Sequence, residues 1–154
     1  VQDRVGVFVN ATPEEVCAIA DQTGLNVLQL HGAEDVEAFR WFRGQVWQVR
    51  RLSQVPNSAE ARRAPDAYVL DSGTAQQPGG TGQTLDWDAA AHFVRAADRP
   101  VILAGGLSPE NVAEAIVRVR PWGVDVSSGV ESAPGCKDHD RIREFVRQCR
   151  QLSR

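Results

Sequence analysis

Val101-Ile-Leu-Ala-Gly-Gly-Leu-Ser-Pro-Glu-Asn-Val112 is an apolar run that stops at two glycines and then meets a helix-start signal. The apolar residues predict a buried parallel strand, and Ser108 as N-cap with Pro109 at the first helical position predicts a helix directly after it. Gly105 and Gly106 lack a Cβ, so their backbone N–H groups can approach an anion closely beside the unpaired donors of the helix start. The stretch is typical of a phosphate-binding βα turn, although a plain tight βα turn fits the same residues.

A second strand-to-turn pattern follows in Gly123-Val-Asp-Val-Ser-Ser-Gly-Val-Glu131. It runs from an apolar strand, expected over Val124–Ser127, into the small residues Ser128 and Gly129. In (β/α)8 barrels the loops after the seventh and eighth strands commonly build one phosphate site, at the face where the strand C-termini emerge. The two consecutive turns therefore predict a shared site for the phosphate of a small-molecule ligand.

The whole chain alternates strand and helix patterns, without a linker or low-complexity stretch that would divide residues 1–154 into domains. Strands are expected at Val5–Val9, Asn26–Leu30, Gln45–Val49, Ala67–Asp71, Val101–Ala104 and Val124–Ser127. Helices are expected at Pro13–Thr23, Glu34–Phe42, Ser58–Arg63, Asp86–Ala97, Pro109–Val119 and Asp138–Leu152, with a loop over Ser72–Thr84. Such βα units imply a single α/β domain with a parallel sheet and right-handed crossovers, either in a barrel or in an open doubly wound sheet.

Composition and charge indicate which kinds of molecule the protein does not bind. The formal net charge is -3 and no cluster of Lys or Arg stands out, which argues against a nucleic-acid or anionic-membrane partner. No signal-peptide pattern opens the chain, and no apolar run approaches the roughly 18 residues of a membrane span. The three cysteines, Cys17, Cys136 and Cys149, are an odd number without metal-like spacing, so we expect no metal site, no disulfide framework and a cytoplasmic location.

Two side chains at the ends of predicted strands are candidates for chemistry. Asp71 ends a strand hydrophobic enough to be buried on both faces, so its carboxyl is expected over the mouth of the sheet. There it could serve as a general acid, or it could brace a loop. His31 follows the strand Asn26–Leu30 and could shuttle protons or hydrogen-bond a substrate, or simply fix a loop. The stretch Gly79-Gly-Thr-Gly82 lacks the Lys-Ser/Thr ending of a P-loop, which favours a substrate-closing loop over a nucleotide site.

Several short blocks follow one another in an order typical of a known enzyme family. They are Val5-Gly-Val-Phe-Val-Asn10, Leu28-Gln-Leu-His-Gly32, Tyr68-Val-Leu-Asp71, Gly79-Gly-Thr-Gly82 with Asp86-Trp87, Leu103-Ala-Gly-Gly-Leu107 with Pro109-Glu-Asn111, and Val124-Asp-Val-Ser-Ser-Gly-Val-Glu131 with Pro134-Gly135 and Lys137-Asp138. Together they resemble phosphoribosylanthranilate isomerase, a single-domain barrel enzyme of tryptophan biosynthesis. The resemblance runs through nearly the whole chain and implies a phosphate-binding TIM (β/α)8 barrel fold.

The resemblance also implies an activity and a set of site residues. The family isomerises N-(5-phosphoribosyl)anthranilate to 1-(2-carboxyphenylamino)-1-deoxyribulose 5-phosphate by an Amadori rearrangement, with neither a cofactor nor a metal ion. Asp71 would be the general acid that protonates the furanose ring oxygen and opens the ring to a Schiff base. Backbone amides of the Gly105-Gly106 and Ser128-Gly129 turns would hold the substrate phosphate, and His31 and Gln29 would line the rest of the pocket.

The chain departs from the family at its start, where the family has two βα units without a counterpart here. Those units carry a Lys-Ile-Cys-Gly strand, whose cysteine is the general base that removes the C2 proton, and a Ser-Pro-Arg turn that contacts the anthranilate carboxylate. Cys17 falls within a predicted helix, and Cys136 falls in the last βα loop, where we expect a variable loop residue rather than a base. At 154 residues the chain is also shorter than the about 200 residues of a complete barrel. We therefore expect a partial barrel of about six βα units.

A partial barrel leaves unpaired N–H and C=O groups on its first and last strands. We expect it to gape, to collapse to a smaller ring or to associate with a second copy through these edges. Two other functions remain open from the residues alone. One is a non-catalytic sugar-phosphate-binding fragment that needs a complementing N-terminal piece. The other is a relative of indole-glycerol-phosphate synthase or of the tryptophan synthase α subunit, which use lysine or glutamates as acid and base, whereas the only lysine here is Lys137.

Overall fold

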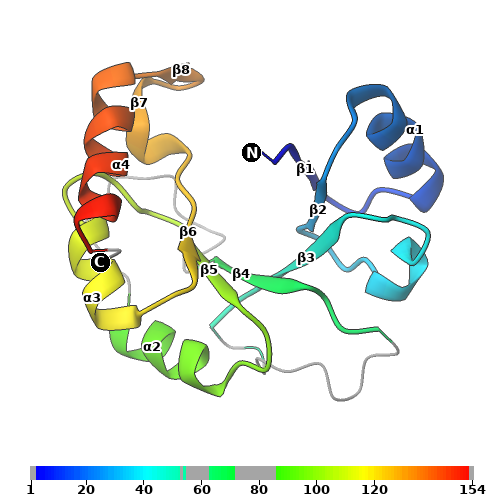
Figure 1. Cartoon of the computed structure of the whole chain (residues 1–154), viewed down its shortest axis with the longest axis horizontal. Helices are drawn as coiled ribbons and strands as arrows, with labels where there is room; N and C mark the ends of the chain where they lie inside the picture. Colours follow the sequence, from blue (N-terminus) through cyan, green and yellow to red (C-terminus); the bar gives the residue numbers. More distant parts are fainter. Residues whose placement is uncertain (1–2, 53, 55–62, 72–85, 153–154) are drawn as a thin grey trace.

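Six parallel strands form the sheet that organises the molecule (Figure 1). The computed structural model describes residues 3–52, 54, 63–71 and 86–152. The strands are β1 (Val5–Phe8), β2 (Val27–Leu30), β3 (Gln45–Arg50), β4 (Ala67–Asp71), β5 (Val101–Ala104) and β6 (Gly123–Val124). They pair in chain order, without the reversal that a doubly wound sheet shows. The sheet is therefore an arc of a barrel, which resolves the alternative left open by the sequence.

Helices follow most of the strands and lie at the two flanks of the sheet (Figure 1). They are α1 (Pro13–Thr23), α2 (Trp87–Ala96), α3 (Val112–Val119) and α4 (His139–Leu152), with the short 3-10 helices η1 (Val36–Phe39) and η2 (Ser128–Val130). The start of α1 is a complete capping box between Thr12 and Glu15, and the helix ends at Gly24 with φ 61°. These local signals explain why its bounds match the prediction.

Two predicted helices are shorter than expected. The helix predicted over Glu34–Phe42 is only the 3-10 turn η1, because the Asp35 side chain accepts a hydrogen bond from Glu37 N–H and the chain continues with i to i+3 bonds. The helix predicted from Pro109 begins at Val112, after a separate turn. The predicted helix Ser58–Arg63, apart from Arg63, and the predicted loop Ser72–Thr84 lie outside the described residues.

The last predicted strand is also shorter. It ends at Val124 rather than Ser127, and η2 follows it. The chain then forms a small antiparallel ribbon of β7 (Glu131–Ala133) and β8 (Cys136–Lys137), which the sequence analysis did not predict. Gly135 makes the tight turn of this ribbon with φ 79°.

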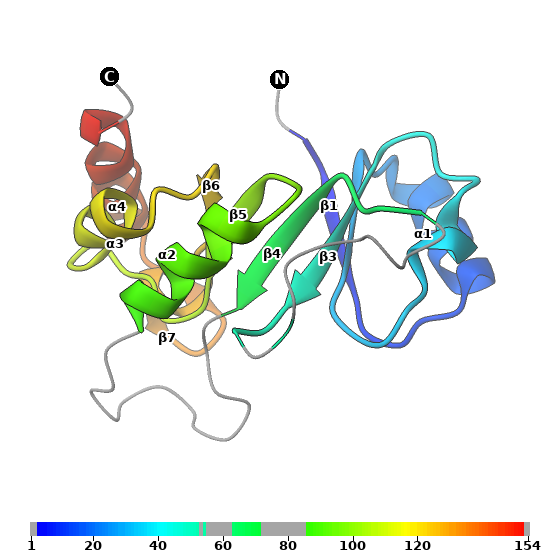
Figure 2. The same ribbon diagram turned by 90° about the horizontal axis from the view of Figure 1, so that it is seen from below.

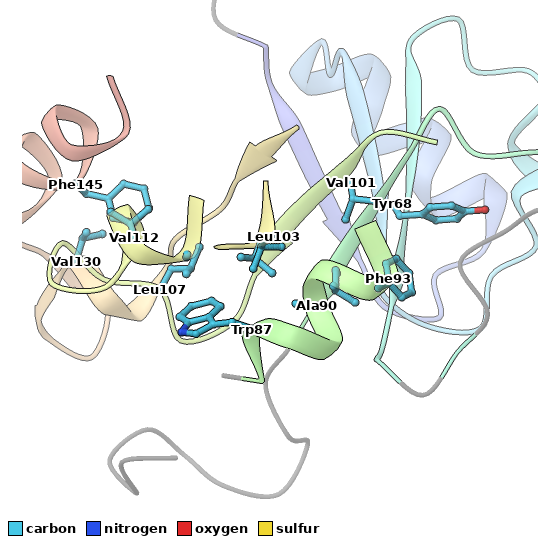
Figure 3. Packing of buried hydrophobic residues seen from close by; sticks show 13 residues of the cluster. Tyr68, Trp87, Ala90, Phe93, Val101, Leu103, Leu107, Val112, Val130 and Phe145 are labelled. Carbon is cyan, nitrogen blue, oxygen red and sulfur yellow. The ribbon is translucent and has the colours of Figure 1, made fainter. Parts of the chain in front are cut away.

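Alternation along the strands divides the buried side chains between two faces. On the outer face, Tyr68 and Leu103 pack with Phe93 of α2 and Val112 of α3, in the cluster drawn in Figure 3. A second outer cluster joins β1, β2 and β3 to α1 and η1, on the other side of the molecule (Figure 2). The inner face carries a smaller apolar cluster of Ala67, Val69, Ile102 and Ala104 with Trp47 and Val49. The helices thus pack against the outer face of the sheet, and no helix of the described residues belongs to the apolar cluster on its inner face.

The arc is open at both ends. Within the described residues, β1 pairs with β2 alone and β6 with β5 alone. The valines of the first strand pattern are accordingly exposed, Val5 by 40%, Val7 by 59% and Val9 by 65%. A gaping arc and a smaller ring are the two shapes expected for a partial barrel by itself, and the structure shows the gaping arc. Association with a second copy stays a prediction. None of the helices in the described ranges has the length and apolar character needed to cross a membrane.

Candidate functional site

Three ionisable side chains follow strand ends along one edge of the sheet, the C-terminal rim. Asp71 is the last residue of β4 and pairs in register with Ala104. The His31 N–H directly after β2 donates to Phe8 O at 2.8 Å. The Asp125 N–H, directly after β6, donates to Leu103 O at 2.8 Å. Because the strands are parallel, their C-terminal ends meet at this rim. The structure thus brings the predicted residues Asp71 and His31 to one edge.

Asp125 is the rim residue that the sequence analysis missed. Although this residue is exposed on the open side of the sheet, partial desolvation of its carboxyl raises its pKa above the ordinary value. The Asp71 carboxylate raises that pKa further, whereas the charge of His31 lowers it. The three groups therefore share one electrostatic environment. In the sequence, Asp125 follows Gly123 and Val124, which form β6. Because the strand was predicted to continue to Ser127, Asp125 was placed inside the strand and not at its end.

Gln29 lies deeper than the rim on the inner face. It precedes His31 by two residues and pairs in register with Val7 of β1 and Trp47 of β3. Only 7% of Gln29 is exposed, and it is the buried polar residue among the described part of the chain. An amide in this position can direct a hydrogen bond toward a ligand over the inner face.

Two turns at the rim match the predicted phosphate-binding residues. Residues 105–108, here called the glycine turn, follow β5, and residues 127–130, here called the serine turn, follow β6. Gly105 and Gly106 have φ values of 83° and 68°, which residues with a Cβ adopt only with strain. A Cβ built on Gly129 would lie 1.8 Å from Leu107 O, so the serine turn packs directly against the glycine turn. The structure therefore brings the four predicted residues of the two turns into one place.

Side chains from outside the turns hold each of them. The Ser108 N–H donates to Asn111 Oδ1 at 2.9 Å, and Asn111 Nδ2 donates to Gly106 O at 3.0 Å. The amide of Asn111 thus closes the glycine turn, which explains why α3 begins only after it. On the other side, Lys137 Nζ donates to Ser127 O at 2.9 Å and pairs with Glu131 at 2.7 Å. The single lysine of the chain therefore braces the serine turn.

The cysteines lie in other environments. Cys17 is in α1, as predicted, where desolvation and the Asp21 carboxylate raise its pKa and disfavour the thiolate. Cys136 is exposed in β8 rather than in an irregular loop. Desolvation raises the pKa of Cys149, which packs against the outer core. In the described ranges, no group of three or more His, Cys, Asp or Glu residues is placed to hold a metal ion.

The sequence and the structure of the chain are similar to those of known proteins. A family model described as N-(5'phosphoribosyl)anthranilate (PRA) isomerase matches residues 1–148. A curated N-(5'-phosphoribosyl)anthranilate isomerase from Haloferax volcanii is 45% identical over 131 residues, which are 83% of this chain and 59% of the relative. The curated relative from Thermotoga maritima is covered over 73% of its length, so the chain spans between about three fifths and three quarters of these relatives.

Solved structures give the same result. The crystal structure of phosphoribosyl anthranilate isomerase from Thermotoga maritima matches with a TM-score of 0.79 and 40% identity, over 97% of this chain and 74% of that one. An isomerase structure in complex with reduced 1-(o-carboxyphenylamino)-1-deoxyribulose 5-phosphate matches with a TM-score of 0.74 and 36% identity, over 97% and 72% of the two chains. The arc of six strands is thus similar to the larger part of each of these structures.

Proposed function

The chain belongs to the N-(5'-phosphoribosyl)anthranilate isomerase family, and we propose that its residues supply the acid and the phosphate-binding part of that family's isomerase site. The predicted family and α/β half-barrel fold are confirmed, and isomerase function at the family level is confirmed with them. One observation carries the proposal for this chain. Asp71 pairs in register with Ala104, the residue that directly precedes the glycine turn. A carboxyl thus lies beside a backbone turn suited to an anion.

In the proposed reaction, the phosphate of N-(5-phosphoribosyl)anthranilate binds backbone amides of the glycine and serine turns. Asp71 gives its proton to the furanose ring oxygen, and the C1–O bond breaks to leave a Schiff base at C1. Loss of the C2 proton to a general base then forms an enolamine, whose tautomerisation gives the 1-deoxyribulose 5-phosphate product. The reaction is an isomerisation, so no atom or electron pair is gained or lost overall.

The remaining rim residues would orient the sugar. Asp125 faces the same region as Asp71, and its carboxylate would accept a hydrogen bond from a ribose hydroxyl. Gln29 in β2 and His31 directly after that strand would contact the substrate between the phosphate and the anthranilate ring. The related isomerase with a bound phosphorylated product analogue supports a ligand of this class.

The general base would come from outside these 154 residues. Cys17 is in an outer helix with a raised pKa, which disfavours it as a base. We propose that the open side of the arc receives the family's two opening βα units, so that residues 1–154 form the C-terminal three-quarters of a complete, single-domain cytoplasmic barrel. Without those units, the exposed valines of β1 favour self-association.

The proposal is tested by following the fluorescence loss of N-(5-phosphoribosyl)anthranilate. We expect no turnover by the chain alone, and turnover when the first two βα units of the Thermotoga maritima relative are fused to it or added as a separate polypeptide. Turnover by the chain alone would mean that it holds its own base, and Cys136→Ser would test the exposed cysteine first. Phosphate-ligand binding without turnover by the completed barrel would instead favour the non-catalytic alternative.

A further inference from the structure

Arg141 of α4 reaches the contact between the two turns. Its Nε and Nη2 donate to Gly129 O at 3.1 and 3.0 Å, so one edge of the guanidinium hydrogen-bonds a backbone carbonyl of the serine turn. Its Nη1 and Nη2 lie 2.9 and 3.0 Å from the two carboxylate oxygens of Glu110. Glu110 follows the glycine turn by two residues. One planar group therefore links both turns to α4.

Glu110 is itself held in place for this contact. Its N–H donates to Ser108 Oγ at 3.3 Å. Hydrogen bonds to Ser108, to its own backbone and to Arg141 lower the pKa of Glu110, which favours the charged carboxylate. Arg141 therefore has an ionised, oriented partner at the pH values where the substrate phosphate is charged.

The contact with Arg141 restricts the backbone of Gly129, a residue that is otherwise flexible. Without a Cβ it has the widest choice of backbone conformations, yet only a glycine fits against Leu107 O. A guanidinium on the Gly129 carbonyl fixes the plane of the peptide that follows it. That plane determines where the serine turn's neighbouring amides point relative to the glycine turn.

We propose that Arg141 is a positioning residue, which fixes the spacing of the glycine and serine turns so that both can hold one phosphate. The inference rests on the proposed phosphate site. Both forks of the guanidinium are occupied by Gly129 O and Glu110, so Arg141 acts through the turns rather than as a phosphate ligand. Its charge is balanced by Glu110, which favours a role in geometry over a role in attraction.

The first test uses inorganic phosphate as the probe and calorimetric titration of the whole chain. We expect Arg141→Gln to raise the Kd for phosphate by about tenfold, the loss of a charged hydrogen-bond contact. Arg141→Lys should recover little, because an ammonium cannot grip both partners in plane. Arg143→Gln is the matched control on the same helix, since Arg143 pairs with the exposed Asp140 one turn away in α4, and it should leave the Kd within about twofold.

A second readout separates this inference from the phosphate site itself. Amide hydrogen exchange across residues 127–130 should rise in Arg141→Gln without ligand and stay unchanged in Arg143→Gln. In the completed barrel, Arg141→Gln should raise KM while kcat stays within about twofold. An unchanged Kd and unchanged exchange in Arg141→Gln would overturn the inference. Faster exchange with no phosphate binding by the unaltered chain would overturn the proposed phosphate site and leave Arg141 a structural clamp only.

Discussion

Asp71 ends β4 and Asp125 directly follows β6, on the two sides of β5, and their surroundings favour different roles. Asp71 completes a strand buried along its length and adjoins the glycine turn through its register with Ala104. Asp125 lies on the open side, where partial desolvation and then the Asp71 carboxylate raise its pKa. A carboxyl with a raised pKa close to a second carboxyl is a common arrangement at sites of proton transfer.

The role of Asp71 gives the first prediction. Asp71→Asn in the completed barrel removes the proton donor while keeping the size of the side chain, so kcat should fall by about 10²- to 10⁴-fold. The measurement is steady-state isomerase kinetics. Asp88→Asn on the exposed face of α2, where Asp88 pairs with Arg118, serves as the control and should keep full activity. Equal rates for Asp71→Asn and the control would exclude Asp71 as the acid.

The raised pKa of Asp125 gives the second prediction. A carboxyl with a folded-state pKa above its unfolded value binds more protons in the folded state, so it lowers stability as pH rises from the unfolded to the folded pKa. Asp125→Asn should therefore unfold at higher urea concentration than the unaltered chain at pH 7, by less than about 1 kcal/mol because the residue is exposed to solvent. The difference should vanish near pH 3. A difference that is constant with pH would contradict this origin.

At the scale of elements, the glycines in and near the two turns have different surroundings, and these decide whether a side chain could replace the hydrogen. Gly129 faces a backbone oxygen at a distance no Cβ could keep, whereas Gly135 has a φ of 79° but open space around it. Gly123 has neither restriction, since a Cβ there would first meet Ile102 at 3.6 Å. Substitutions at these glycines therefore separate the effect of a steric clash from the effect of backbone strain within one chain.

The third prediction compares these glycines. Gly129→Ala must move the two turns apart and should cost about 1 to 3 kcal/mol in urea unfolding, together with phosphate binding. Gly135→Ala should cost about 1 to 2 kcal/mol from its left-handed backbone alone and keep phosphate binding. Gly123→Ala should be nearly neutral. If Gly129→Ala bound phosphate as well as Gly135→Ala does, the close contact of the turns would be irrelevant to the site.

The same elements show how far the sequence could lead. The capped helix α1 and the strands β2, β4 and β5 were predictable because their signals are local: Thr12, Pro13 and Gly24 mark a helix, and short apolar runs mark buried strands. The start of α3 was not, because it depends on Asn111 turning back to Gly106. The ribbon β7–β8 was missed because three- and two-residue strands have too little periodicity to detect.

The candidate site residues follow the same division. The rim positions of Asp71 and His31 could be predicted because each lies at the end of a recognisable apolar strand. Asp125 and Arg141 could not, because the first depends on where β6 ends and the second on the packing of α4 against both turns. Contacts between distant parts of the chain carry no pattern along a single sequence.

At the scale of the whole molecule, two of the exposed apolar surfaces of the described residues lie beside the open side of the arc. One is the inner side of β1, with its exposed valines. The other is a groove on α4, lined by Ile142, Arg143, Val146, Arg147, Arg150 and Gln151. In Figure 1 β1 and α4 border the same open side of the arc. We expect both surfaces to receive the two opening βα units that the family resemblance implies, with a strand beside β1 and a helix beside α4.

The last prediction follows from the exposed edge. An unpaired parallel strand with an apolar face offers both hydrogen bonds and hydrophobic surface to a second copy, so the chain should associate reversibly at micromolar concentration in sedimentation velocity. Val7→Lys places a charge on β1 and should shift the distribution to monomer. Val117→Lys is the matched control, because Val117 is 58% exposed, close to the 59% of Val7, but lies on α3. If both variants reduced association equally, general surface hydrophobicity rather than the β1 edge would drive it. Addition of the first two βα units of a relative should dissociate the unaltered chain, because they would compete for the edge through which the copies associate.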